Sequence, residues 1–200
     1  MPTTSSRRGR RPGAPDTRAT ILDAARASFA ERGFAGTTIR GVASAAGVDA
    51  ALVHHYFGTK DDLFLAAMEL PVDPRTLIAP ALEGGPDGAG ERLLRAFLSM
   101  WDDPELSPVL VGVVRSALQP GGERLLTQGI VPVLLMPVGQ ALGIDRPELR
   151  IPLVISQVAG LILTRYVVGL EPIASMPAET VVSSYAPVLQ HFLTGDLAES

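Results

Sequence analysis

Residues 37–60, which read TTIRGVASAAGVDAALVHHYFGTK, decide the fold. Apolar residues recur at helical spacing from Ile39 to Ala46, and a second short apolar run ends near Tyr56. Gly47 breaks the first run, and the Asp49 carboxylate can cap the start of the second. Because only about residues 46–49 separate the two predicted helices, the pattern is that of a helix-turn-helix.

Helices are also predicted on both sides of this unit. Upstream, Asp16 or Thr17 can cap a helix with one apolar face, and Gly33 can close it. Downstream, the spacing Thr-x-x-Asp that begins at Thr59 is a capping box, which starts a fourth helix expected to end near Leu70. The turn therefore sits inside a small helical domain.

Charge divides the chain at the same place. Residues 1–60 carry nine basic and four acidic side chains, whereas residues 61–200 carry eight basic and seventeen acidic ones. The formal net charge of the whole chain is −4. A cationic N-terminal part on an anionic body suggests that only the N-terminal part meets a polyanion. We expect a disordered basic arm over 1–15, a helix-turn-helix DNA-binding domain over 16–60, and a further helical domain over 61–200.

The rest of the chain also has helical patterns, without the regular alternation or hairpin signals of strands. The fold class is therefore expected to be all-α. The predicted helices are 75–82, 89–102, 105–118, 123–142, 148–168 and 178–193. Four prolines inside them are expected to kink or split their helices: Pro132, Pro137, Pro152 and Pro187.

The segment from Thr37 to Lys60 resembles the DNA-binding signature of the TetR family of bacterial transcriptional regulators. The matching features are Thr-Thr, an Ile-x-x-Val-Ala face, Ala-Gly-Val, a short second helix ending in Tyr-Phe, and Thr-Lys. The resemblance covers about a quarter of the chain, from Thr20 to Ala67. It implies that the chain forms a homodimer that binds a DNA operator through the second helix of the unit. It also implies that a small-molecule effector enters the C-terminal domain and releases the DNA. Repression is the commoner mode of regulation in this family.

The second helix of the unit is the expected reading element, because a helix fits the major groove with its N-terminal residues at the base edges. Alanines there permit close approach, the histidines and tyrosine can bond bases or phosphates, and a lysine at a helix N-terminus favours anions. Two positions depart from the family pattern: Asp49 stands where the family usually has Ser or Thr, and His54 stands where it usually has Tyr. The predicted DNA-binding residues are Arg10, Arg11, Thr37, Thr38, Asp49, Ala50, Ala51, His54, His55, Tyr56, Thr59 and Lys60.

Effector residues are harder to choose, because an apolar helix face serves a core as readily as a pocket. Arg115 and Arg165 stand out, because each lies in an otherwise apolar stretch. A buried arginine needs a partner, which can be an acidic residue of the protein, solvent or an anionic ligand. The predicted ligand-binding residues are Phe97, Trp101, Arg115, Met136, Gln157 and Arg165. The helices 148–168 and 178–193 are expected to form the dimer interface, where Ala159 and Gly160 allow close approach.

Several chemistries find no support in the sequence. There is no cysteine, so disulfides and thiolate metal sites are excluded, and adjacent His54 and His55 do not face each other on a helix. No nucleophile–base motif or phosphate-binding loop is present, so we expect no enzyme activity, metal or cofactor. Neither a signal peptide nor a clean membrane span is expected, which favours a cytoplasmic location.

Two alternatives remain open at this point. One is a helical ligand-binding protein or enzyme whose basic N-terminal part is incidental. The other is a DNA-binding structural protein without ligand control. Nucleic acid that copurifies with the protein would speak against the first, and a ligand-dependent thermal shift against the second.

Overall fold

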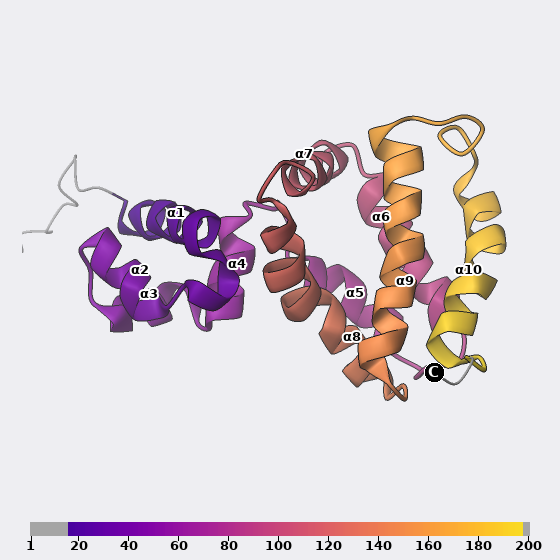
Figure 1. The fold of residues 1–200 in the computed structure, drawn as a ribbon, viewed down its shortest axis with the longest axis horizontal. Coiled ribbons are helices and arrows are strands. Elements are labelled where there is room, and N and C mark those ends of the chain that lie inside the picture. The colour runs from indigo at the N-terminus through magenta and orange to yellow at the C-terminus, as the bar shows by residue number, and fades with distance from the viewer. Residues whose placement is uncertain (1–15, 198–200) are drawn as a thin grey trace, which may run out of the picture.

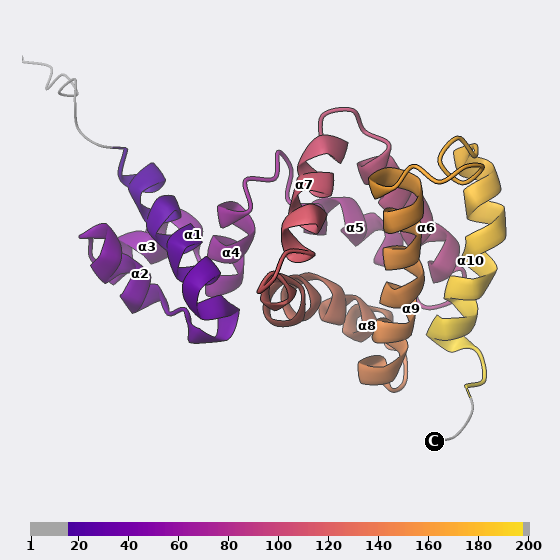
Figure 2. The same ribbon diagram turned by 45° about the horizontal axis from the view of Figure 1, so that its top comes forward.

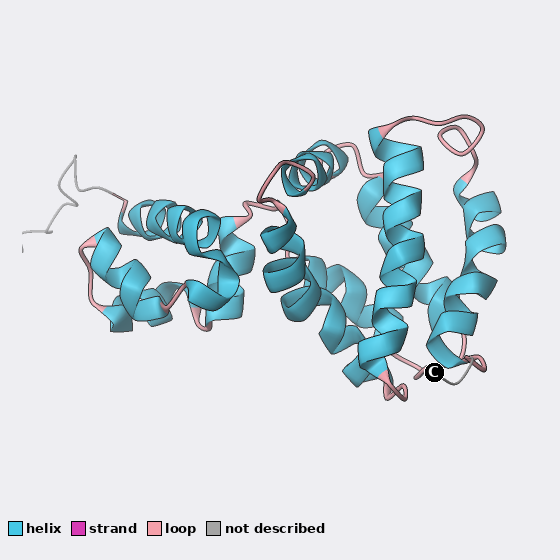
Figure 3. Cartoon of the chain, viewed as in Figure 1, coloured by secondary structure: helices cyan, strands magenta, loops and turns pink. Residues whose placement is uncertain are grey.

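The computed structural model describes residues 16–197, and every regular element in this range is a helix (Figure 3). The expected all-α class is therefore confirmed. The predicted basic arm, with Arg10 and Arg11, lies outside the described residues.

The first four helices form a compact head at one end of the molecule (Figure 1). They are α1 (Thr17–Gly36), α2 (Ile39–Ala46), α3 (Ala50–Phe57) and α4 (Lys60–Ala67). Each has a side-chain cap at its start: Asp16, Thr38, Asp49 and Thr59 accept hydrogen bonds from backbone N–H groups of the first turn. The head core is buried at Ile21, Leu22, Ala25, Val42, Ala43, Val53, Phe57 and Leu63.

Two helix ends in the head involve residues with a positive φ. Gly33 has φ +68° and ψ 178°, which is not helical, so it interrupts α1 as predicted, although a short helical segment continues beyond this kink to Gly36. The fourth helix ends at Ala67 rather than near Leu70, and Glu69 takes a positive φ of 53° in the turn that follows. The apolar periodicity does not reveal this earlier end.

The remaining helices form the body (Figures 1 and 2). They are α5 (Pro74–Leu82), α6 (Ala89–Trp101), α7 (Ser107–Ala117), the π-helix η1 (Leu125–Leu135), α8 (Met136–Leu142), α9 (Pro147–Leu161), the π-helix η2 (Ile162–Val167) and α10 (Ala178–Thr194). The predicted helix 123–142 thus divides into η1 and α8, with Pro132 inside η1 and Pro137 in the first turn of α8. Pro152 and Pro187 do not split their helices, because α9 and α10 continue through them, so a kink is the part of that prediction that stays open.

The body is built around the packing of α6 against α10. Leu94 and Leu98 from α6 meet Val181 and Leu189 from α10 in one buried cluster. Gly90 permits this approach, since a Cβ there would lie only 2.7 Å from the Ala186 carbonyl oxygen. This part of the body therefore forms a close-packed frame.

Two helical stretches of the body are apolar enough to cross a membrane by length and composition. They cover Leu125–Leu142 and Pro147–Val167. The sequence-based expectation of no span is thus not supported on this criterion. The evidence for a span is weak, because core helices of soluble proteins pass the same test.

Head and body meet through α1 and α4 on one side and η1 on the other. The edge of the Phe64 ring lies where a Cβ on Gly129 would be, so α4 and η1 touch directly. At Gly33, a Cβ would clash with the Gln128 side chain, which places α1 equally close to η1. Two glycines therefore allow the close contact between head and body.

The two helices α9 and α10 lie side by side at the opposite end of the body from the head (Figures 1 and 2).

Candidate nucleic-acid interface and effector cavity

Helix α3 is anchored in the head by one face and leaves the other face open. Val53 is 0% exposed and Phe57 8%, both within the head core. Ala51, His54 and His55 are exposed, and Tyr56 is 44% exposed. Helices α2 and α3 lie on the side of the head away from the body (Figures 1 and 2). The open face of α3 can therefore approach another macromolecule without obstruction from the body.

The two departures from the usual residue pattern have structural roles within α3. Asp49 Oδ1 accepts a 2.7 Å hydrogen bond from the Ala51 N–H, so its carboxylate caps the helix. His54 Nδ1 lies 2.8 Å from the Gly58 carbonyl oxygen at the other end of the same helix. Both side chains remain exposed, and their polar contacts hold the ends of α3 in place.

Three further predicted DNA-binding residues lie at helix N-termini. Thr38 is exposed, and its hydroxyl accepts from the Gly41 N–H at the start of α2. Thr59 forms the predicted capping box with Asp62 at the start of α4. Lys60 follows it, with its Nζ 4.2 Å from the centre of the Phe34 ring. The ammonium therefore rests on an aromatic face at a helix end that already favours anions.

Thr37 is a correction to the predicted set. Its side chain is buried, at 1% exposure, and its hydroxyl donates to the Gly33 carbonyl oxygen at 2.8 Å. The Thr37 hydroxyl oxygen also lies 2.9 Å from Ser28 Oγ. Thr37 thus ties the end of α1 to the turn, and its side chain is not available to DNA.

Arg40 was missed as a site residue, although it was counted in the charge of the N-terminal part. It is exposed in the first turn of α2, directly after Thr38 and Ile39. A basic side chain at the N-terminus of the first helix of the unit was the signal that would have found it.

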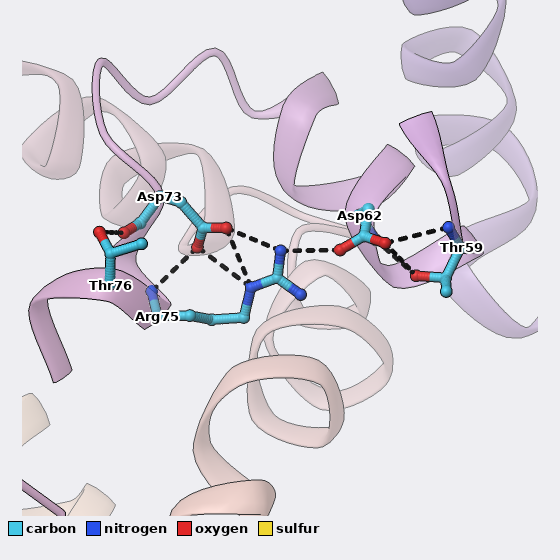
Figure 4. A network of polar contacts seen from close by, with 5 residues as sticks. All are labelled: Thr59, Asp62, Asp73, Arg75 and Thr76. Carbon is cyan, nitrogen blue, oxygen red and sulfur yellow. Dashed lines mark hydrogen bonds and ion pairs between the residues drawn. The ribbon is translucent and has the colours of Figure 1, made fainter. Parts of the chain in front are cut away.

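A chain of polar contacts links the N-terminal end of α4 to the first helix of the body (Figure 4). The Thr59 hydroxyl donates to Asp62 at 2.6 Å, Asp62 pairs with Arg75 at 2.7 Å, and Arg75 pairs with Asp73 at 2.7 Å. Hydrogen bonds from Thr59, and then from Arg75, lower the pKa of Asp62 below its ordinary value. The pKa of Asp73 is lowered chiefly by its hydrogen bond from Arg75.

The six predicted effector residues do not converge on one place. Phe97 and Trp101 are buried in the α6–α10 core, and the Trp101 ring lies 5.1 Å from that of Tyr166. Arg115 is exposed on α7. Met136 packs on a separate buried cluster, and Gln157 donates to the neighbouring Ser156 hydroxyl. These positions therefore stay a prediction without a common pocket.

Arg165 is held by the protein itself. Its Nη1 donates to the carbonyl oxygens of Ile173 at 2.8 Å and Met176 at 2.6 Å, and its Nη2 pairs with Asp102 at 3.5 Å. The Tyr166 hydroxyl donates to the same carboxylate at 2.8 Å. Of the three partners considered from the sequence, an acidic side chain of the protein is thus present.

A cavity of about 590 Å³ lies between the head and the body. Helices α1 and α4 contribute one wall, and α7 with the loop that leads into η1 contributes the other. None of the six predicted effector residues lines it. The lining residues are Arg26, Phe29, Ala30, Gly33, Phe34, Phe64, Ala67, Met68, Val109, Gly112, Val113, Ser116, Gln119, Pro120, Gly121, Gly122, Arg124 and Leu125.

Comparison with known proteins places both parts of the chain. Residues 21–67 match the family described as bacterial regulatory proteins, tetR family, and residues 87–193 match the tetracyclin repressor-like C-terminal domain. The second match alone spans more than half of the chain.

Individual relatives agree with these matches. The HTH-type transcriptional regulator BetI of Brucella anthropi is 46% identical over 54 residues, which are 27% of this chain and 28% of that protein. The HTH-type transcriptional repressor AcnR of Corynebacterium glutamicum is 33% identical over 90 residues, 45% of this chain and 43% of that one. The matched segment thus covers less than half the length of these curated relatives. A crystal structure of a TetR-family regulator from Streptomyces coelicolor is 41% identical, with 92% of this chain and 98% of that chain covered, at a TM-score of 0.48.

Proposed function

This chain belongs to the TetR family of bacterial regulatory proteins, and from that premise we propose that it is a transcriptional regulator, acting as a repressor, that binds a palindromic DNA operator as a homodimer and is released by a small-molecule effector. The observation that carries the proposal is the open face of α3. A helix fixed by Val53 and Phe57 presents Ala51, His54 and His55 to the outside.

In the proposed complex, α3 lies in the major groove. Ala50 and Ala51 in its first turn are small enough to let the backbone approach base edges, and alanine can contact a thymine methyl group. His54 and His55 offer ring nitrogens to bases or phosphates. These contacts carry the sequence specificity of binding.

Phosphates are contacted by residues around this face. Lys60 and Arg40 supply cations, while Tyr56, Thr38 and Thr59 supply hydroxyl groups. Arg10 and Arg11 would extend the cationic surface. Contacts of this kind fix the register of the protein on DNA without reading sequence.

The proposed homodimer forms through α9 and α10. In an 18-residue apolar window within Pro147–Val167 only 17% of the residues are buried within the chain, and Val188 on α10 is 39% exposed. Ala159 and Gly160 are exposed on α9, and nothing lies within 4 Å of a Cβ added at Gly160. An apolar surface of this kind suits an interface between copies of the chain. Two α3 helices about 34–36 Å apart would then read two half-sites one DNA turn apart.

Effector control is proposed on the two-state principle. A ligand releases DNA only by binding more tightly to the form of the dimer in which the two α3 helices are wrongly spaced. We propose a cytoplasmic, non-enzymatic protein whose body domain carries this control.

The test is binding of a labelled duplex of random sequence by the purified protein, followed by fluorescence anisotropy as the salt concentration rises. We expect binding at low salt that weakens linearly in log K against log salt, because phosphate contacts release counterions. A helical ligand-binding protein or enzyme with an incidental basic head predicts no binding at any salt concentration, and that result would refute the proposal.

A further inference from the structure

The cavity between head and body has the size and the walls of a ligand site. Its volume of about 590 Å³ lies within the roughly 300–1,000 Å³ of typical small-molecule pockets. Phe29, Phe34 and Phe64 line one side as a packed aromatic group, with ring centres 5.2 to 5.9 Å apart. Met68 and Leu125 add further apolar surface. Such walls favour a flat apolar or aromatic molecule.

The charged groups of the lining are both cationic. Arg26 and Arg124 line the cavity, and no acidic residue does. Arg26 is already paired with Asp23 and Glu69. Arg124 is exposed and makes no ion pair among residues 16–197, so its guanidinium can bind an anionic group at the cavity mouth.

The position of the cavity couples its occupancy to the placement of the head. One wall belongs to α1 and α4, which carry the rest of the head, and the other belongs to α7 and the start of η1. The π-helix η1 touches α1 through Gln128 and α4 through Gly129. Helices of this type are rare and are frequently found at functional sites. A molecule between these walls therefore contacts the elements that set the angle between head and body.

We propose that this cavity is the effector site and that it takes a small molecule with an apolar, aromatic body and one anionic group, which pairs with Arg124. Occupancy fixes the head on the body in a position that lowers the affinity for DNA. This inference deepens the proposed function and rests on it for its regulatory part only, because binding in the cavity can be measured without DNA.

The probe is 1-anilinonaphthalene-8-sulfonate, an aromatic anion whose fluorescence rises in apolar surroundings. Two variants address the cavity: Gly112→Leu, which fills it, and Arg124→Gln, which removes its unpaired cation. Gly112 lines the cavity on α7 with nothing within 4 Å of a Cβ added there, so leucine enters open space. The matched controls are Ala141→Leu and Arg18→Gln, two exposed positions outside the lining. Cooperative thermal unfolding of each variant shows that fluorescence does not come from a molten state.

We expect saturable binding that Gly112→Leu weakens roughly tenfold or more, since the space is lost, and that Arg124→Gln weakens about threefold to fivefold, as for a partly exposed ion pair. The controls should bind like the unaltered chain. Equal binding by all five proteins would overturn the proposed site.

The regulatory part has its own outcome. The probe should lower the affinity for the labelled duplex, and by reciprocity DNA should lower the affinity for the probe by the same factor. Binding that depends on Gly112 and Arg124 but leaves DNA affinity unchanged would overturn the effector role. If the protein binds no DNA at all, the proposed function fails, while the fluorescence titration still decides whether the cavity is a ligand site.

Discussion

At the scale of single residues, Lys60 offers the sharpest prediction about DNA binding. It is the only lysine in the sequence, and its Nζ rests on the Phe34 ring at the N-terminus of α4. Lys60→Ala should weaken binding to every duplex sequence alike and flatten the slope of log K against log salt by about 0.9, the value for one lost phosphate contact. Anisotropy titrations at several salt concentrations measure the slope.

The control for Lys60 is Arg115→Ala, which removes an exposed cation from the body instead of the head. This variant should keep the slope of the unaltered protein. Equal slopes for Lys60→Ala and the unaltered protein would show that Lys60 does not contact DNA.

Arg75 allows a second residue-scale prediction, this time on pH. The pKa values of Asp62 and Asp73 are lowered from 3.8, so the stability that they contribute is present above about pH 4 and is lost as the pH falls through the lowered values. Arg75→Ala should raise both pKa values towards 3.8 and reduce the stability at neutral pH by at most about 1 kcal/mol, because the ion pairs are partly exposed. Carboxyl NMR titration measures the pKa values, and unchanged values for Asp62 and Asp73 would contradict the network.

At the scale of secondary-structure elements, Gly33 forms the kink in α1 that lies against η1. Its φ is +68°, so Gly33→Ala strains the backbone, and the added Cβ would also push aside the end of the Gln128 side chain. We expect a loss of stability of about 1–3 kcal/mol, measured by denaturant unfolding. Gly112→Ala is the matched control, because its Cβ would meet open space inside α7. A loss no larger for Gly33→Ala than for this control would refute the role of Gly33.

The elements also show where prediction from sequence succeeds. The head was predictable because its signals are local: Asp49 and Thr59 cap their helices within three residues, and Gly47 breaks α2. The π-helix η1 was not predictable, because nothing in the apolar pattern of 123–142 distinguishes a π-helix from an α-helix.

Side-chain direction limits prediction of the site in the same way. Thr37 and Thr38 are adjacent and identical in type, yet one is buried and the other exposed, which depends on the turn that follows Gly33. Trp101 lies on an apolar helix face, and only the packing of α10 against α6 shows that this face belongs to the core. The cavity was missed because its walls come from segments far apart in the chain.

At the scale of the whole molecule, the proposed dimer depends on the apolar surface of α9 and α10. Val188→Glu would place a charge in that interface and should convert the dimer to a monomer, measured by sedimentation velocity. Val72→Glu is the matched control, because Val72 is 40% exposed against 39% for Val188 and lies between α4 and α5. A dimer that persists in Val188→Glu, or that dissociates equally in Val72→Glu, would contradict the interface.

The central claim is that a dimer of this chain reads DNA with two copies of α3. The most direct test incubates the protein with a pool of random duplexes and sequences the retained DNA. The account predicts an inverted repeat with half-site centres about 10–10.5 base pairs, or a multiple of that, apart. Retention of no DNA at low salt, or of DNA without any inverted repeat, would contradict it.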